Sequence, residues 1–417
     1  MIELGRRKFL VVGSATALSP WLPRAFGADA PLSPISNHWG VAETKKLPLD
    51  EICAFRGRPG AAYNHHHQVV FDRGRLYVSW SDGIVGEDNP GQRMLFATSE
   101  DDGKSWSSEQ QITPKPPEET SVFTAMGIRP YRDHLVAYYG HYAWTPLAYD
   151  ENGQRYWPEE KYQGDSTKWL HRDIYTAVRI SDDGGRSWGP PRRIIDGFVP
   201  NLRPSPTSSG RLIIPGNISF PYTDDPAGIH HWKRVGIPRL PKWTVDDPEG
   251  FLKACSARQD PINYCEASFF QTDDNKIHMM LRTAVFAHHH HNGLLAVTES
   301  MDNGQTWSEP MLTSYTDCSC RFQFGRLPDG RFYGLSCPDP KGGRNPLVLA
   351  ISKDGVNFDR HYVLGDIKMA KPRMPGNDKG GAFGYPTCDI ANNNMYIVYS
   401  RSKEDINFMR LPLSAIA

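Results

Sequence analysis

The chain has 417 residues, of which 47 are lysine or arginine and 47 are aspartate or glutamate, so its formal net charge is zero. A balanced charge excludes the strong positive field that attracts nucleic acid or an anionic membrane. The length allows two or three average domains or one closed architecture of this size. Because the net charge is zero, any acidic ligand must be recognised by individually placed residues.

The N-terminus has the pattern of an export signal. The sequence GRRKFL at 5–10 precedes an apolar run at 11–22 and a segment of small residues at 25–28. This order resembles a twin-arginine signal, and no other apolar run approaches the length of a membrane span. We expect a signal peptide at 1–28, a single domain at 29–417, no membrane span, and a periplasmic or secreted protein. The alternative is a cytoplasmic N-terminal helix.

Short runs of β-branched and aromatic residues recur along the rest of the chain, with turn-forming residues between them and almost no helical periodicity. This pattern is typical of strands joined by tight turns. The predicted strands are 68–72, 75–80, 94–98, 134–139, 175–180, 211–214, 276–281, 294–298, 331–335, 347–351 and 395–400. The sequence therefore predicts an all-β fold.

One turn motif, S-x-D-x-G-x-[ST]-W, occurs at 99–106, 181–188 and 300–307, and a shortened copy lies at 352–358. In the first copy, Asp101 can accept backbone N–H bonds, Gly103 can adopt a positive φ, and Trp106 can pack under the adjacent sheet. Repetition at long intervals indicates one recurring supersecondary unit with loops of different length between copies. We therefore assign the motif to the fold rather than to catalysis.

The motif resembles the Asp-box, or bacterial neuraminidase repeat, of the sialidase superfamily. The resemblance implies a six-bladed β-propeller, with seven blades if residues 220–260 contain another. Grouping the strands by motif places blades at 63–106, 120–188, 196–260, 263–307, 318–358 and 380–417. A strand from 39–55 should complete the last blade, because an open ring leaves sheet edges unpaired.

Two other features concern loops and thiols. The segments 144–169 and 220–260 are expected to be long loops that rim one face and select the substrate. Seven cysteines lack the spacing of a zinc site, and their odd number leaves at least one unpaired within a monomer. We expect mostly buried free thiols.

The resemblance also implies site residues. In sialidases a tyrosine nucleophile is paired with a glutamate, an aspartate acts as acid/base, and three arginines hold the substrate carboxylate. The matching positions make Tyr385 the nucleophile and Glu266 its partner, with Asp88 as the acid/base. Arg282 and Arg344 match the second and third arginines.

Each assignment has a structural alternative. Tyr385 could be a core aromatic residue, and Asp88 a turn former with Glu87 as a rival acid/base. Glu266 opens one predicted strand and Arg282 closes the next, so a hairpin returns both to the same end of a blade. The alternative for these two is an ordinary cross-strand ion pair.

A histidine run replaces the first arginine of sialidases. Where that family has an Arg-Ile-Pro segment, this chain has His65, His66 and His67, and a neutral imidazole cannot replace a bidentate guanidinium. Strand alternation predicts His65 and His67 on one face and His66 on the other. At least one ring should enter the central funnel, where it could act as a general base or bind metal. His141 ends a predicted strand and could join such a site.

The sequence therefore leaves three hypotheses. The first is an exported exo-acting glycoside hydrolase that cleaves a terminal acidic or acid-linked sugar from a glycan. The second is an α-L-rhamnosidase or L-rhamnose-α-1,4-glucuronate lyase, because the histidine run and Glu87-Asp88 also resemble propellers with those activities. The third is a non-catalytic glycan-binding propeller. We expect a glycan partner, no nucleic acid and no required cofactor or catalytic metal, and leave a structural calcium open.

Overall fold

The computed structural model describes residues 32–47, 49–144, 172–200, 202–238, 263–284, 293–369, 371–376 and 379–416. The chain falls into two compact units, Met1–Ala30 and Pro31–Ala417. The expected signal peptide therefore lies outside the described residues, as do most of the two expected rim loops. In the part of the chain that is described, no helix is long and apolar enough to cross a membrane.

The described residues form six sheets, which confirms the all-β fold. The first sheet contains β4 (Tyr63–Asp72), β5 (Arg75–Gly83), β6 (Arg93–Ser99) and β7 (Gln110–Gln111). The second contains β8 (Ser121–Tyr131), β9 (His134–Ala143), β10 (Arg172–Ser181) and β11 (Arg192–Asp196). The third contains β12 (Ser205–Pro206), β13 (Leu212–Ile213) and β14 (Tyr222–Thr223).

The fourth sheet contains β15 (Asn263–Gln271), β16 (Ile277–Ala284), β17 (Leu294–Ser300) and β18 (Met311–Thr316), with β1 (Ser33–Ser36) at its edge. The fifth contains β19 (Gln323–Arg326), β20 (Phe332–Ser336), β21 (Leu347–Ser352) and β22 (Arg360–Gly365), with β2 (Glu43–Lys46) at its edge. The sixth contains β23 (Gly384–Ala391), β24 (Asn394–Arg401), β25 (Asp405–Pro412) and β3 (Glu51–Phe55), and a 3-10 turn follows at Leu413–Ile416.

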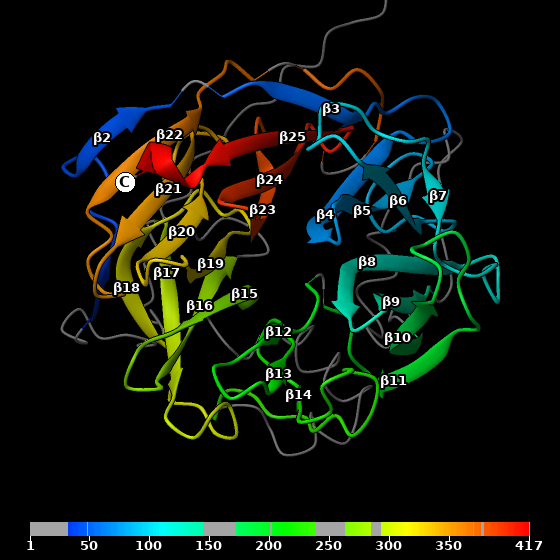
Figure 1. Ribbon diagram of the computed structural model, residues 1–417, viewed down its shortest axis with the longest axis horizontal. Coiled ribbons are helices and arrows are strands. Elements are labelled where there is room, and N and C mark those ends of the chain that lie inside the picture. Colours follow the sequence, from blue (N-terminus) through cyan, green and yellow to red (C-terminus); the bar gives the residue numbers. More distant parts are fainter. Residues whose placement is uncertain are drawn as a thin grey trace, which may run out of the picture. The chain divides into compact units, whose positions relative to one another are not determined.

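The sheets of the unit 31–417 are arranged as in a propeller, with the first strand of each sheet innermost (Figure 1). β4 contacts β8 on one side and β23 on the other, and β19 contacts both β15 and β23. Each predicted grouping contains the inner strands of one sheet, but β7, β11, β18 and β22 follow the Asp-boxes and lie beyond the predicted bounds. The third sheet is short, and the proposed extra blade falls largely outside the described residues. Side chains at the starts of the inner strands are thereby brought together from different sheets.

The N-terminal segment supplies three outer strands. β3 pairs antiparallel with β25 and completes the sixth sheet, as expected from the segment 39–55. β1 and β2, which were not predicted, pair in parallel with β18 and β22. The segment therefore covers the outer edges of three sheets and protects their unpaired backbone groups.

Each Asp-box joins its own sheet to the preceding one. In the first copy, the Ser99 hydroxyl donates to Asp101 and accepts from the Gly103 N–H, while Asp101 accepts from the Ser105 N–H at 2.9 Å. Trp106 then packs edge-on against Phe408 of the sixth sheet, with ring centroids 5.2 Å apart. The other copies pack in the same way on the sheet before them, through Trp188 on Phe96, Trp307 on Phe220, and Gly355 beside Phe270. The structural role predicted for the motif is confirmed.

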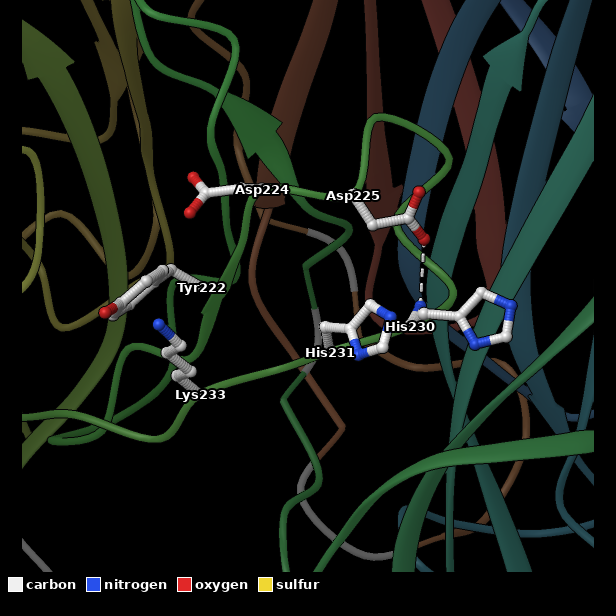
Figure 2. Close-up of a pocket in the computed structure, with 6 residues that line it drawn as sticks. All are labelled: Tyr222, Asp224, Asp225, His230, His231 and Lys233. Carbon is white, nitrogen blue, oxygen red and sulfur yellow. Dashed lines mark hydrogen bonds between the residues drawn. The ribbon is translucent and has the colours of Figure 1, made fainter.

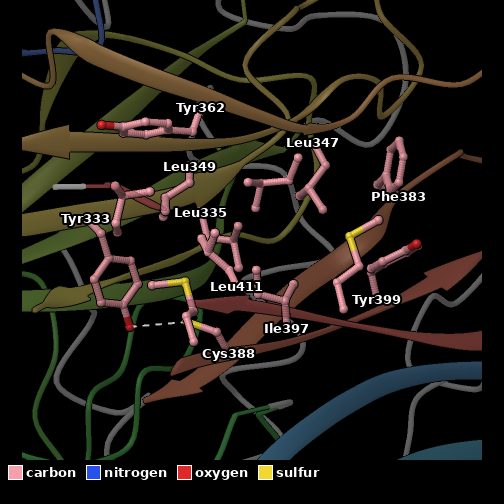
Figure 3. Packing of buried hydrophobic residues seen from close by; sticks show 14 of the residues in the cluster. Tyr333, Leu335, Leu347, Leu349, Tyr362, Phe383, Cys388, Ile397, Tyr399 and Leu411 are labelled. Carbon is pink, nitrogen blue, oxygen red and sulfur yellow. Dashed lines mark hydrogen bonds between the residues drawn. The ribbon is translucent and has the colours of Figure 1, made fainter. Parts of the chain in front are cut away.

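Apolar side chains fill the space between neighbouring sheets. Figure 3 shows Leu335 and Leu349 of the fifth sheet facing Ile397 and Leu411 of the sixth, and all four are fully buried. Burying one such side chain contributes about 1.5–3 kcal/mol. This packing holds the inner strands in fixed positions, and it therefore also fixes the backbone of the polar residues at their ends.

Candidate active site

Tyr385, Glu266 and Arg282 meet at one end of the inner strands. Tyr385 lies near the start of β23, Glu266 near the start of β15, and Arg282 near the end of β16, in register with Cys265. The Tyr385 hydroxyl donates to one oxygen of Glu266, and Arg282 donates to the other. Arg282 Nη1 also lies 3.3 Å from the Tyr385 hydroxyl, and Ser319 Oγ accepts from Arg282 Nε and Nη2. The predicted hairpin geometry of Glu266 and Arg282 is confirmed.

The charges in this group favour a protonated tyrosine beside an ionised carboxylate. Burial disfavours the charged form of Glu266, but the Arg282 charge and the Tyr385 hydrogen bond outweigh it and lower the pKa of Glu266. Burial and the Glu266 charge hold the pKa of Tyr385 well above its usual value, although Arg282 and Arg344 act in the opposite direction. The proton therefore stays on Tyr385 in the free site, and Glu266, which is ionised and hydrogen-bonded to the phenol, is placed to accept it when the phenolic oxygen reacts.

Two more guanidinium groups lie against the Tyr385 ring. The Arg321 and Arg344 guanidinium carbons lie 4.8 Å and 5.3 Å from its centroid. Arg344 Nη1 is buried and has no hydrogen-bond partner among the described residues. Arg321 is fully buried and donates to the His67 carbonyl oxygen at 3.0 Å. Tyr385 is 5% exposed, but its hydroxyl faces charged groups, so it is not an ordinary core aromatic residue.

Sequence reasoning missed Arg321. The available signal was its position two residues before β19, because polar residues at the starts of β4, β15 and β23 also enter this site. A charged side chain at the start of an inner strand is therefore a sign of a site residue in this fold.

A β-bulge in each of three inner strands turns a side chain into the site. His66, Glu266 and Tyr385 have φ values of 50°, 52° and 53°, and the strand register shifts at each of them. A non-glycine residue in this conformation costs about 1–3 kcal/mol. Bulges often re-aim side chains beside active sites. Three equivalent bulges around one tyrosine therefore mark this end of the strands as a functional site.

The histidine run lies against Tyr385, but not with the predicted alternation. The ring centroids of His65 and His66 are 5.1 Å apart, and they lie 4.0 Å and 5.7 Å from that of Tyr385. The bulge at His66 breaks the strand alternation and brings these two rings together. His67 Nε2 donates to the Tyr385 carbonyl oxygen at 2.8 Å. Burial and nearby cations hold the pKa of His65 and of His67 well below the usual value, so both rings are neutral.

Glu87 joins the histidines. His66 Nε2 lies 3.4 Å from Glu87 Oε1, which also accepts from the Tyr63 hydroxyl at 3.0 Å, while Lys403 donates to Glu87 Oε2. Burial raises the pKa of Glu87, but the Lys403 charge and the His66 contact outweigh it and lower that pKa well below its usual value. A second ionised carboxylate therefore lies near Tyr385.

Asp88, the expected acid/base, has different contacts. The Tyr142 hydroxyl donates to its carboxylate, and its carbonyl oxygen accepts from Trp144 Nε1 at 2.8 Å. The structure thus brings Glu87 to the histidines and holds the Asp88 carboxylate against Tyr142. The acid/base role of Asp88 stays a prediction.

His141 is fixed within the second sheet. Its Nδ1 lies 2.9 Å from the Asp173 carbonyl oxygen and its Nε2 lies 3.0 Å from Ser121 Oγ. Its ring stacks on Tyr175 at 4.5 Å, and burial lowers its pKa. Both ring nitrogens are engaged locally, and these contacts support a structural role rather than the substrate contact predicted from the sequence.

Two cavities lie away from Tyr385. A cavity of about 460 Å³ beside the third sheet is lined by Tyr222, Asp224, Asp225, His230, His231 and Lys233 (Figure 2). Asp225 accepts backbone N–H bonds from Ala227, Ile229 and His230, so its carboxylate stabilises the loop.

The second cavity, of about 800 Å³, is lined by residues that follow the bulges of β4, β15 and β23, among them Gln68, Phe71, Phe270, Cys388 and Asp389, and by Gln323 at the start of β19. Tyr385 lies at the bulge of β23, before the lining residues of that strand, and is not among the residues that line the cavity. This cavity is therefore distinct from the Tyr385 cluster.

Comparisons with known proteins agree with this architecture. The family described as BNR repeat-like domain matches residues 128–397. No curated protein matches the chain. Among solved structures, the chain is similar to the NanB sialidase from Streptococcus pneumoniae, with 14% identity, a TM-score of 0.57, and coverage of 88% of this chain and 71% of that one.

Two further structures show the same fold. A leech intramolecular trans-sialidase complexed with 2,7-anhydro-Neu5Ac has 14% identity and a TM-score of 0.58, covering 88% of this chain and 71% of that one. A protein of unknown function from Dyadobacter fermentans has 15% identity and a TM-score of 0.57, covering 88% and 98%. At these identities the likeness concerns the fold alone. Since the family match spans more than half of its length, the chain belongs to the BNR repeat-like domain family and has the sialidase-like fold.

Proposed function

We propose that this protein is an exported, exo-acting glycoside hydrolase that removes a terminal acidic or acid-linked sugar from a glycan. The contact of Tyr385 with Glu266 and Arg282 carries the proposal. A phenol beside an ionised carboxylate is an activated nucleophile, and nearby guanidinium groups stabilise the phenolate that forms. The twin-arginine pattern at 5–10 supports export.

In the proposed mechanism, Glu266 takes the Tyr385 proton as the phenolic oxygen attacks the anomeric carbon. The bond to the leaving-group oxygen breaks, and that oxygen takes a proton from the acid/base, for which Asp88 and Glu87 are the two candidates. The acid/base then takes a proton from water, whose oxygen attacks the anomeric carbon. The bond to the Tyr385 oxygen breaks, and Glu266 returns its proton to that oxygen as the sugar is released. A neutral nucleophile suits an acidic sugar because a carboxylate nucleophile would be repelled by the substrate's own charge.

The charges around Tyr385 favour an anionic substrate. Arg282, Arg321 and Arg344 all approach it, and Arg344 Nη1 has a buried donor available for an oxygen of the substrate. Arginine pairs with carboxylate through parallel N–H donors. Because His65–His67 stand where sialidases have their first arginine, we infer a substrate other than sialic acid itself, such as a glycan that contains a uronic acid.

The histidines give a second candidate function some support. His65 and His66 lie beside Tyr385, so an imidazole or the phenol could abstract the proton next to a uronate carboxylate while Arg282 or Arg344 neutralises that carboxylate. The protein would then be a lyase acting on L-rhamnose linked to glucuronic acid, or a rhamnosidase at the same linkage.

One assay separates the candidates. The full-length protein is incubated with a panel of sialosides and rhamnosyl-glucuronate glycans, and products are followed by mass spectrometry and far-ultraviolet absorbance. A hydrolase adds water and yields two saturated sugars, whereas a lyase yields an unsaturated uronate that absorbs. Full activity in Tyr385→Phe would overturn the glycosidase proposal, and tight binding of a glycan without turnover would favour a binding protein.

A further inference from the structure

The orientations of His65, His66 and Glu87 have a chemical consequence beyond the proposed hydrolysis. One ligand-type atom from each of the three lies within 4.8 Å of the other two. His65 and His66 are 0% and 5% exposed, and His65 Nε2 has no hydrogen-bond partner among the described residues. A buried polar atom without a partner calls for an explanation, and an ion is one. We propose that these three residues bind one divalent transition metal ion, with zinc as the best fit.

The second nitrogen of each imidazole is already fixed. His65 Nδ1 lies 2.8 Å from Ser400 Oγ, and His66 Nδ1 lies 3.2 Å from Ser81 Oγ. Metal-binding histidines nearly always have such a partner on the other ring nitrogen, because it sets the tautomer and the ring orientation. With Nδ1–H donating to the serine, Nε2 carries the lone pair that a metal needs.

The separation between His66 Nε2 and Glu87 Oε1 suits a shared metal. Ligands at about 2.0–2.1 Å from a tetrahedral zinc lie about 3.3–3.4 Å from each other. The observed distance is 3.4 Å, which is longer than an ordinary N–H···O hydrogen bond. When His66 Nδ1–H donates to Ser81, the Nε2 lone pair faces a carboxylate oxygen at this distance, and a cation between the two atoms would replace the proton that otherwise joins them.

Consecutive histidines on a regular strand cannot share a metal, because their side chains point to opposite faces. The bulge at His66, with φ of 50°, removes this obstacle. The strained backbone thus brings two imidazoles to one carboxylate. Two imidazoles and one carboxylate favour zinc or another first-row divalent ion over calcium, which prefers oxygen ligands.

Nearby positive charge limits the affinity. Lys403 donates to Glu87 Oε2, and the charges of Lys403 and Arg344 both act on His65. A dication must be bound against these charges, although Glu87 Oε1 remains on the histidine side. Removing the Lys403 charge should therefore tighten metal binding.

The test uses chelator-treated full-length protein in which the four histidines at 288–291 are replaced by asparagine, so that they cannot bind the probe. Zinc chloride is titrated by calorimetry, and bound zinc is counted by elemental analysis after dialysis. We expect one zinc per chain, at least 10-fold weaker binding in His65→Ala and in the near-isosteric Glu87→Gln, and tighter binding in Lys403→Met.

His134→Ala is the matched control, because His134 pairs with Asp182 on the surface of the second sheet. It should bind zinc like the parent. Circular dichroism checks that each variant is folded. If His65→Ala does not fold, Glu87→Gln is the variant that tests the site. The proposal is overturned if the parent binds no zinc, or if folded Glu87→Gln binds it as tightly as the parent. Zinc binding is measured without substrate, so its failure is distinct from failure of the glycosidase proposal.

Discussion

The Tyr385 hydroxyl donates a hydrogen bond to Glu266, a residue 119 positions earlier in the chain and on a different sheet. Arg282 contacts both groups, so a phenol, a carboxylate and a guanidinium form one buried unit.

Tyr385→Phe should reduce kcat/KM on the substrate found in the panel assay by at least about 1,000-fold, since the nucleophilic oxygen is lost. Tyr139→Phe is the matched control, because the Tyr139 hydroxyl is also buried but has no hydrogen-bond partner among the described residues. Tyr139→Phe should keep its activity. Equal losses in the two variants would show that Tyr385 acts through the fold.

Glu266→Gln should lower the free energy of unfolding by about 3 kcal/mol at pH 7, because it leaves the charge of Arg282 buried without its counter-ion. Urea unfolding measures this, and adding Arg282→Met should recover part of the loss. Since the pKa of Glu266 is lowered on folding, its contribution is present above the unfolded pKa and is lost as pH falls through the folded one. A loss that persists at lower pH would contradict this origin.

Gly103→Ala should destabilise the protein by about 2–4 kcal/mol, from positive φ and overpacking together. Gly103 has φ of 83°, and an added Cβ would lie 2.1 Å from Phe408. Gly74 is the control, because its φ is 82° but an added Cβ meets nothing within 4 Å. Gly74→Ala should cost about 1 kcal/mol. Equal urea midpoints for the two variants would show that the contact with the preceding sheet contributes little.

Asp317→Asn should stabilise the protein increasingly as pH rises. Burial, with the nearby Cys320, raises the pKa of Asp317 to about 8. A carboxyl group whose pKa rises on folding reduces stability as pH increases from its unfolded pKa to its folded one. The gain should grow from about 1.5 kcal/mol at pH 5 to as much as about 4 kcal/mol at pH 7. A pH-independent difference in urea unfolding would refute the shifted pKa.

Local chemistry explains what could be predicted from the sequence. A run of apolar and aromatic residues such as HLVAYY at 134–139, followed by turn signals, is typical of a buried strand, and Asp101 makes its bonds within four residues. The meeting of Tyr385 with Glu266 was predictable only because both residues match positions in a known family.

The remaining site features depend on non-local geometry. Strand alternation placed His65 and His66 on opposite faces, but a bulge depends on how the strand packs against its neighbours. Arg321 stands in no motif, so only the sheet arrangement shows that it reaches Tyr385. The choice between Glu87 and Asp88 concerns adjacent residues in a loop, and only the structure shows that Glu87 contacts Tyr63 while Asp88 contacts Tyr142.

The pairing of β3 with β25 joins two strands that are far apart in sequence, so the sixth sheet can form only after both have been synthesised. Residues 51–55 are synthesised long before their partner at 405–412, because the other five sheets lie between them in the sequence. During translation the sixth sheet therefore stays incomplete, and the edge of β3 remains available for wrong pairing. A chain that terminates before Asp405 can never complete this sheet, so the pairing distinguishes finished chains from truncated ones. Completion of the sixth sheet therefore follows synthesis of the other five sheets, and β3 gains its partner only after all the inner strands have been made.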